Sequence, residues 1–486
     1  MNSVRRIVKN SGASLLTQIS TPASSFVLVY FIARLLGVSG LGVYTSALSV
    51  LFIFQAFASL GFQHLITREV AQDTSKASKF FVNASFLGVI FSIPIAGFMC
   101  LSVPLVTDDS EVIRAVYVLS ISLVPYTFGV VCQSISRGFE KLEHITIAIV
   151  TGNVFKLLLG IIVLFQKLGL VYLMFVILGS HFLIFIISLF LTLKCISKAR
   201  QNLSAINIVF CKWILRNTPV FALILIVAAI RFYINIVILT SMMGARDVGF
   251  FSAADRLVNL FSLGISFYIF AIQPVIFRLF KSSLEKFEIV CIESFRYFMI
   301  FILPVITTIT LLGNRFIVLI FERDFLPSAY VLNILIWVLL LKGFNQIFAN
   351  ALIASNNQII NLKANIIGMI SNIGLSLLLI PNLSYIGAGI AGAASAFVTF
   401  FYQNHYVSRN LFKIKYFYLA KKPFFASLLM GLVILLFKDS YLVILILIAP
   451  VAFILSLLAL KAISARDMDI IQKIWRDEKK IVVTQK

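Results

Sequence analysis

The chain alternates between long apolar segments and short polar connections along most of its length. A helix that crosses the hydrocarbon core of a bilayer needs about 20 mostly apolar residues. Fourteen segments meet this requirement, and their apolar residues are continuous rather than alternating, which excludes barrel strands. The predicted spans cover residues 11–35, 41–63, 81–105, 112–135, 145–166, 170–193, 214–241, 248–275, 292–313, 327–352, 359–380, 386–407, 418–437 and 441–461. The pattern predicts an all-α polytopic membrane protein with about 14 transmembrane helices.

Positive charge is distributed unevenly over the connections between these spans. If the N-terminus is cytoplasmic, 30 of the 41 Lys and Arg residues fall on the cytoplasmic side and eight on the opposite side. Cytoplasmic loops of membrane proteins are enriched in Lys and Arg, so we predict that both termini are cytoplasmic. The same rule explains the net charge of +22 without nucleic acid as a partner.

The chain contains a weak internal repeat. "RLLGVSGLGVYTSA" (34–47) aligns without gaps on "SMMGARDVGFFSAA" (241–254), which pairs Gly37 with Gly244 and Gly42 with Gly249. Six spans separate the copies, so the halves run in the same direction, as in transporters built from parallel repeats. We therefore predict an N-terminal six-helix lobe (1–205), a C-terminal six-helix lobe (206–412), an additional helix pair (413–462) and a basic cytoplasmic tail (463–486) that contains an amphipathic helix.

Polar residues at helical spacing form stripes along several predicted spans. In isolation, each such residue is explained by hydrogen bonding between helices. Stripes that run the length of several spans instead favour a polar cavity, since helix contacts need only one or two polar residues per span. The predicted lining of this lumen consists of Gln18, Asn235, Asp255, Asn345, Gln346, Asn365 and Asn372.

Three basic residues, Lys156, Arg231 and Lys342, lie inside predicted spans, and two more, Arg34 and Arg256, lie towards their outer ends. A charge at the centre of a bilayer costs about 2.5–3.5 kcal/mol even on translocon scales. For Lys156 the alternative is that the side chain reaches the interface. No acidic residue lies in the middle of a predicted span. We therefore expect the counter-ion to arrive with an anionic, phosphate-bearing cargo.

The composition and the missing motifs argue against an enzyme. The chain is 60% hydrophobic and 12% charged, whereas soluble proteins are about 25% charged. It has no phosphate-binding G-x-x-x-x-G-K-[ST] loop, no H-E-x-x-H motif and no CxxC pair, and its His residues are isolated from one another and from Cys in the sequence. It also lacks the pattern of a removable signal peptide. We expect translocation, with neither cofactor nor metal.

Several stretches resemble one family of transporters. "ARLLGVSGLGVYTSALSVLFIFQAFASLGFQHLITREVAQD" (33–73) is similar to the signature of the polysaccharide-transporter family of the MOP superfamily, which contains the Wzx-type O-antigen and capsule flippases. "MMGARDVGFFSAADRLVNLFSLGISFYIFAIQPVIFRLF" (242–280) and "YIGAGIAGAASAFVTFFYQNHYVSR" (385–409) resemble its seventh-to-eighth and twelfth spans. The similarity covers most of residues 1–410.

The resemblance implies a flippase that moves an undecaprenyl-pyrophosphate-linked oligosaccharide across the bacterial inner membrane by alternating access of two lobes. In that interpretation Arg231, Lys156 and Lys342 hold the pyrophosphate, and Arg34 and Arg256 receive it at the outer end. The expected partners are the lipid-linked oligosaccharide, membrane lipids and assembly proteins such as a polymerase and a chain-length regulator. Coupling to protons, to sodium or to the membrane potential stays open. The alternatives are a MATE-type multidrug or cation antiporter, a peptidoglycan-precursor flippase and a scaffold for an assembly complex.

Overall fold

The computed structural model describes residues 3–199 and 204–462. In order along the chain, the described residues form α1 (Ser3–Ala58), α2 (Phe62–Gln72), η1 (Thr74–Lys76), α3 (Ala77–Val106), α4 (Ser110–Ser120), α5 (Leu123–Gly138), α6 (Leu142–Phe165), α7 (Leu170–Lys198), α8 (Ile208–Asn217), α9 (Pro219–Met243), α10 (Ala245–Ser282), α11 (Leu284–Phe321), η2 (Arg323–Phe325), α12 (Ser328–Ala354), α13 (Gln358–Asn410), α14 (Tyr416–Leu436) and α15 (Leu442–Ala459). The predicted amphipathic helix in the tail lies outside the described residues.

The helices account for the predicted spans. Eleven are long and apolar enough to cross a membrane, and α4 and α5, which meet at a 44° bend, pass the same test together. Two of the eleven contain a break: non-helical backbone at Gly37 divides α1, and non-helical backbone at Ser384 divides α13. Counting the halves separately gives fourteen segments. The prediction of an all-α polytopic membrane protein is confirmed.

Two short helices were not predicted. Helix α2 occupies a stretch that we expected to be a loop after the second span, and α8 precedes the seventh span. The predicted boundaries of that span, 214–241, were wrong at the start, because α9 begins at Pro219. Proline has no N–H to donate and is well suited to the first turn of a helix. It therefore separates α9 from α8, whose first turn is capped by the Asn207 side chain.

The described residues belong to two compact units. The first comprises Met1–Leu260, Ile320–Val331 and Met369–Ser395, and the second comprises Phe261–Leu319, Leu332–Gly368 and Ala396–Lys486. In the first unit, a cluster of buried side chains that includes Phe62 and Phe80 packs α2, α3, α5 and α8 together. The predicted division into lobes at residue 205 stays a prediction.

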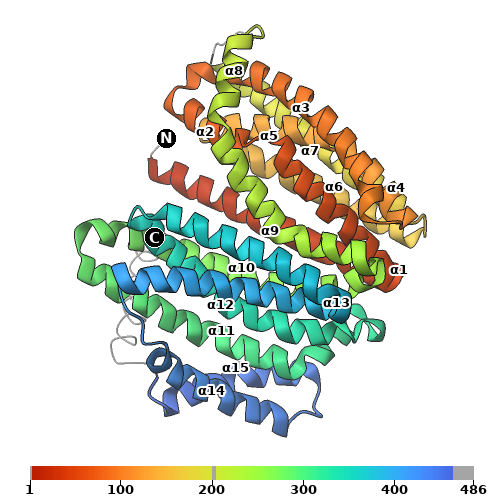
Figure 1. The fold of residues 1–486 in the computed structure, drawn as a ribbon. Helices are drawn as coiled ribbons and strands as arrows, with labels where there is room; N and C mark the ends of the chain where they lie inside the picture. The colour runs from red at the N-terminus through yellow and green to blue at the C-terminus, as the bar shows by residue number, and fades with distance from the viewer. Residues whose placement is uncertain (1–2, 200–203, 463–486) are drawn as a thin grey trace, which may run out of the picture. The chain divides into compact units, whose positions relative to one another are not determined.

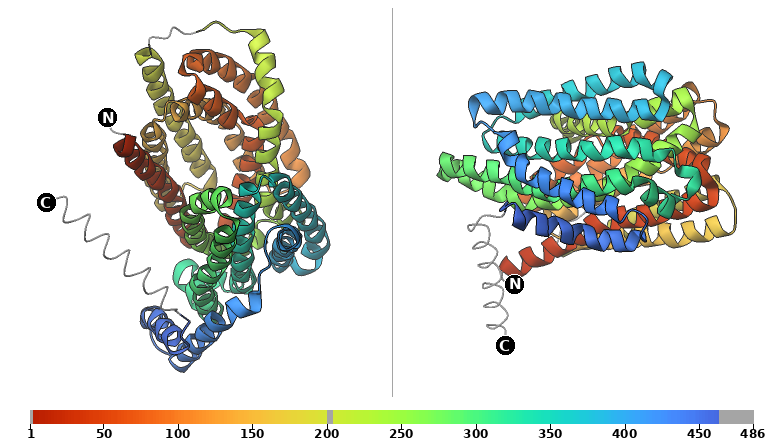
Figure 2. Two further views of the ribbon diagram at one scale, coloured as in Figure 1. Left: turned by 90° about the vertical axis from the view of Figure 1, so that its left-hand side faces the viewer. Right: turned by 90° about the horizontal axis from the view of Figure 1, so that it is seen from below.

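In the second unit, α14 and α15 lie side by side (Figures 1 and 2) and pack on α11 through a buried cluster that contains Leu312 and Met430. A polar contact supports this packing at the turn between α14 and α15. The guanidinium of Arg315 donates to the carbonyl oxygen of Ser440 at 2.8 Å and also to that of Lys438. One side chain of α11 thereby holds the turn that joins the two helices.

We expect Arg315→Ala to loosen this turn. Hydrogen bonds that involve a charged group each contribute about 1.5–3 kcal/mol, so trypsin should cleave after Lys438 roughly ten times faster in the variant. Arg114→Ala is the matched control, because the hydrogen bonds that Arg114 makes with the described residues stay within its own helix turn, to Ser110. Equal cleavage rates in wild type and Arg315→Ala would show that the apolar cluster alone holds the pair.

Candidate functional site

The two glycine turns of the repeat adopt the same backbone conformation. Gly37 has φ 68° and ψ −165°, and Gly244 has φ 83° and ψ −177°. Residues that carry a Cβ atom rarely adopt a positive φ of this kind, which explains why glycine stands at both positions. The turns connect the first span to the second and the seventh to the eighth, so the agreement in backbone geometry supports the alignment of the two sequences.

The two turns also pack against each other in a reciprocal way. A Cβ atom at Gly42 would lie 1.6 Å from the carbonyl oxygen of Ala245, and one at Gly249 would lie 2.1 Å from that of Val38. Val38 and Ala245 are separated by the same 207 residues as the two glycines. Each copy of the repeat therefore presents a glycine to the backbone of the other, as in an interface formed by a two-fold axis.

Two further contacts in the first unit join segments of the two predicted lobes, and a third, on α1, accompanies one of them. The hydroxyls of Ser46 and Thr240 are hydrogen-bonded at 2.7 Å in a buried position. The Arg34 Nε atom lies 3.8 Å from Oε1 of Glu322, and the Arg34 guanidinium stacks on the Tyr30 ring at 4.6 Å. Arg34, predicted to receive the cargo at the outer end, is thus exposed and near a carboxylate.

Two of the predicted cations come together in the first unit. Lys156 of α6 and Arg256 of α10 lie within electrostatic range of each other, although 100 residues separate them in the sequence. Both side chains are half-buried, and among the described residues neither forms an ion pair with a carboxylate. Two positive charges held near each other in membrane-spanning helices form a site suited to an anion.

Aromatic residues surround these cations. Tyr44, which is 2% exposed, and Tyr233 both interact electrostatically with Arg256. On the other side, Lys156 lies within electrostatic range of His181, and the His181 ring packs edge-on against Tyr126 with the ring centroids 6.1 Å apart. We call Lys156, Arg256, Tyr44 and Tyr233 the cation–tyrosine cluster. Both cations were predicted from the sequence, whereas the tyrosines were not.

Arg231 and Asp255 also belong to the first unit, on α9 and α10. Arg231 is half-buried. Asp255 accepts a hydrogen bond from the Asn259 side chain at 2.7 Å, one turn along the same helix, and it interacts electrostatically with Tyr233. Asp255 is therefore linked to the cation–tyrosine cluster through Tyr233.

Of the polar residues predicted to line the lumen, Asn235 bonds other helices. It is 8% exposed, donates to the carbonyl oxygen of Ala388 at 3.2 Å and accepts from the Ser376 hydroxyl at 3.1 Å. These are contacts between α9 and α13 of the kind that hold spans together. Asn372 is also buried, whereas Gln18 is exposed and donates to Ser14 on its own helix.

The other predicted residues belong to the second unit, on α12 and α13. Asn345 is buried and donates to the carbonyl oxygen of Ala396 at 3.1 Å, while its own side-chain oxygen has no partner among the described residues. Asn365 bonds Asn361 one turn away. Gln346 is exposed and Lys342 is half-buried. The structure thus divides the predicted site between two units, and the cation–tyrosine cluster is the part whose members are placed together.

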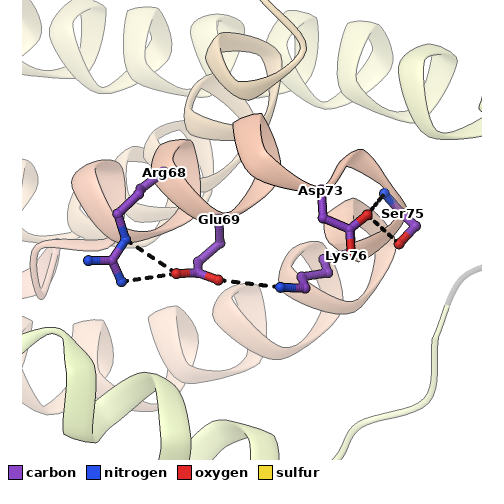
Figure 3. A network of polar contacts seen from close by, with 5 residues as sticks. All are labelled: Arg68, Glu69, Asp73, Ser75 and Lys76. Atoms are coloured by element: carbon purple, nitrogen blue, oxygen red, sulfur yellow. Dashed lines mark hydrogen bonds and ion pairs between the residues drawn. The ribbon is translucent and has the colours of Figure 1, made fainter.

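A second polar network, not predicted from the sequence, lies at α2 and η1 (Figure 3). The Glu69 carboxylate, 12% exposed, accepts from the Arg68 guanidinium at 2.9 Å and pairs with the Lys76 ammonium at 3.5 Å. Beside it, the hydroxyl and the backbone N–H of Ser75 bond the Asp73 carboxylate and hold the pKa of Asp73 below its ordinary value. Because the charges in this network balance, it braces the connection between α2 and α3 rather than forming an anion site.

The family of the chain follows from comparison with known proteins. A sequence model described as "polysaccharide biosynthesis protein" matches residues 7–280, which is more than half of the 486 residues. The chain belongs to the polysaccharide biosynthesis protein family. The matched range contains Lys156, Arg256 and both glycine turns of this family member.

Individual relatives agree with this family. The chain is 27% identical over 128 residues to the probable low-salt glycan biosynthesis flippase Agl15 of Haloferax volcanii, and the match spans 26% of the chain and 27% of that relative. The fold of this polysaccharide biosynthesis protein is similar to that of the lipid II flippase MurJ in an inward closed conformation, with a TM-score of 0.76, 16% identity and coverage of 95% of the chain and 99% of MurJ. It is also similar to an inward-facing multidrug resistance MATE transporter of the MOP superfamily, with a TM-score of 0.67, 16% identity and coverage of 82% and 98%.

These comparisons confirm the predicted polysaccharide-transporter family and its MOP-superfamily fold. The relatives named above are a probable glycan biosynthesis flippase, a lipid II flippase and a multidrug resistance transporter. Within the described residues, there is no group of three or more His, Cys, Asp or Glu side chains placed to hold a metal ion.

Proposed function

We propose that this protein is a flippase for an undecaprenyl-pyrophosphate-linked oligosaccharide, the repeat unit of an O-antigen or capsule, in the bacterial inner membrane. The observation that carries the proposal is the pair of cations in the cation–tyrosine cluster. Lys156 and Arg256 lie in membrane-spanning helices, repel each other and have no carboxylate partner among the described residues. A diphosphate supplies the missing charge, since its oxygens accept hydrogen bonds from Lys and Arg.

The cluster also suits the other parts of such a cargo. The hydroxyls of Tyr44 and Tyr233 can donate to phosphate oxygens, and the half-buried Tyr233 ring offers a flat surface to a sugar. We infer that Arg231 and Asp255, which lie on the same two helices as Tyr233 and Arg256, extend this polar surface. The lipid tail stays in the bilayer while the oligosaccharide travels through a cationic lumen by alternating access of two lobes. In this proposal both termini are cytoplasmic, and the chain works beside a polymerase and a chain-length regulator.

The alternative, a MATE-type antiporter for cationic drugs, fits the cluster poorly. Lys156 and Arg256 repel a cation, and Asp255 already accepts a hydrogen bond from Asn259. A peptidoglycan-precursor flippase shares the diphosphate chemistry, and the fold similarity to MurJ is consistent with it. These two flippase functions differ in the glycan that is carried, so an experiment with defined cargoes separates them.

The test is translocation in proteoliposomes that contain the purified protein. We expect a fluorescent undecaprenyl-pyrophosphate-linked oligosaccharide to change leaflet much faster than in protein-free vesicles. The parallel cargoes are lipid II and a cationic dye. Transport of lipid II in preference to the oligosaccharide would assign the protein to peptidoglycan synthesis. Transport of the dye alone would reject the diphosphate cargo.

A further inference from the structure

His181 is a half-buried titratable group to which the proposed mechanism assigns no role. It lies on α7, eleven residues after the start of that helix at Leu170. Its Nδ1 atom is buried and has no hydrogen-bond partner among the described residues. A buried ring nitrogen of histidine is normally paired with a carbonyl, a carboxylate or water, because an unpaired polar atom is costly. An unpaired nitrogen at this depth therefore requires an explanation.

The surroundings of His181 oppose a positive charge on its ring. Helix α7 packs against α4, α5 and α6. From α5 the Tyr126 ring meets His181 edge-on, and from α6 the Lys156 ammonium lies within electrostatic range. Helix α4 contributes no charged contact to His181 among the described residues. With Lys156 positive and the cargo absent, a proton on His181 would add a second positive charge beside the first.

A bound diphosphate reverses this balance. The proposed cargo brings negative charge to Lys156 and Arg256, and the field at His181 then favours a proton. We propose that His181 is a proton-binding site that fills when a diphosphate occupies the cation–tyrosine cluster. This inference rests on the proposed function, because it takes the occupant of the cluster to be a diphosphate. Linkage makes the effect reciprocal, so a proton on His181 strengthens diphosphate binding by the same factor.

The cargo itself cannot imitate this behaviour. In a lipid-diphosphate-sugar each phosphorus carries one ester bond and the shared anhydride bond, so it keeps a single acidic oxygen that stays ionised near neutral pH. A dependence of cargo affinity on pH between about 5 and 8 must therefore come from the protein, where histidine titrates. The proton and the diphosphate would move together, which lowers by one the charge carried in each cycle.

The experiment measures binding of a farnesyl-diphosphate-linked monosaccharide to the purified full-length protein across this pH range. We expect affinity to rise as pH falls, by up to about tenfold per pH unit, as a single linked proton allows. A pH indicator dissolved in a weakly buffered solution should show that the protein takes up close to one proton for each diphosphate that it binds. His181→Gln should still bind but should lose the pH dependence and the proton uptake.

Two further variants make the result specific. His405→Gln changes an exposed histidine of the second unit and should keep the full pH dependence. Lys156→Arg places at this position a positive charge that does not titrate, and this variant should also show the full pH dependence. A pH dependence that persists in His181→Gln, or binding by the wild type that does not change with pH, overturns the role of His181. Failure of the wild type to bind the diphosphate at any pH instead rejects the proposed function itself.

If His181→Gln is poorly folded, His181→Asn provides a second test, because its amide can occupy the position of Nδ1. Thermal stability in detergent identifies the folded variant. Loss of proton uptake in a folded variant that still binds supports the proposal, and unchanged proton uptake contradicts it.

Discussion

Replacing Gly42 or Gly249 by alanine is expected to reduce glycan export at least about tenfold. The added Cβ atom would lie 1.6 Å from the Ala245 carbonyl oxygen in one variant and 2.1 Å from that of Val38 in the other. Both obstacles are backbone atoms, which cannot move away as a flexible side chain could. Overpacking of this kind costs about 1–3 kcal/mol, and about 1.4 kcal/mol changes an equilibrium constant tenfold. The two repeats would then no longer close against each other at their glycine turns.

Export is measured as surface glycan in a host that depends on this protein, with the amount of protein in the membrane as reference. Gly97→Ala is the matched control, because a Cβ atom at Gly97 meets nothing within 4 Å. Alanine there favours the helix by up to about 1 kcal/mol, so this variant should export normally. Because the contact is reciprocal, Gly42→Ala and Gly249→Ala should have similar effects. Normal export by both would mean that the contact does not need to close during transport.

Removing both cations of the cluster, with Lys156→Met and Arg256→Leu, is expected to abolish glycan export. Each single variant leaves one cation for the diphosphate and should reduce export about tenfold or more, since a hydrogen bond to a charged group contributes about 1.5–3 kcal/mol. The losses should not add, because both residues bind the same group. Lys156→Arg preserves the charge and should retain more export than Lys156→Met.

Stability separates a functional loss from a folding defect in these variants. A charge within the membrane costs about 2.5–3.5 kcal/mol, so Lys156→Met should melt at the same temperature as the wild type or higher. A residue that serves binding often lowers the stability of the fold, so replacing it commonly raises the melting temperature. Lys363→Met removes an exposed lysine of the second unit and should change neither property. Full export by the double variant would exclude Lys156 and Arg256 from cargo binding.

The sequence predicted well those features that depend on neighbouring residues. Each predicted span corresponds to a helix, to half of one or, for 112–135, to the bent pair α4 and α5, because membrane insertion depends on the apolar content of a continuous stretch. The pairing of Gly37 with Gly244 was visible because the turn needs a backbone conformation that glycine adopts. The short helices α2 and α8 were missed because each has about ten residues, too few to stand out as a membrane span, and α2 is polar as well. The start of α9 was misplaced because the predicted span also included the last turn of α8, which ends at Asn217.

The candidate site could be predicted only as a set of residue types. Buried cations without buried carboxylates already indicated an anionic cargo, but the sequence placed Lys156 with Arg231 and Lys342 at mid-membrane and Arg256 at the outer end. The structure instead places Lys156 within electrostatic range of Arg256. Asn235 and Asn345 donate hydrogen bonds to backbone carbonyls of other helices. Such bonding between helices was the alternative to a polar cavity for the residues of the polar stripes. Periodicity identifies which face of a helix is polar, but not what that face meets.

By itself, then, the sequence determined that this is a membrane protein, and it determined the spans, the repeated turn and the transporter family. Each of these features depends on residues that lie close together along the chain. Only the tertiary structure decided which distant side chains meet. His144 and Cys195, isolated in the sequence, lie 3.5 Å apart through Nδ1 and Sγ. His181, equally isolated, lies beside Lys156. Helices that are far apart along the chain bring these groups together, and packing between helices depends on the whole fold rather than on any one segment.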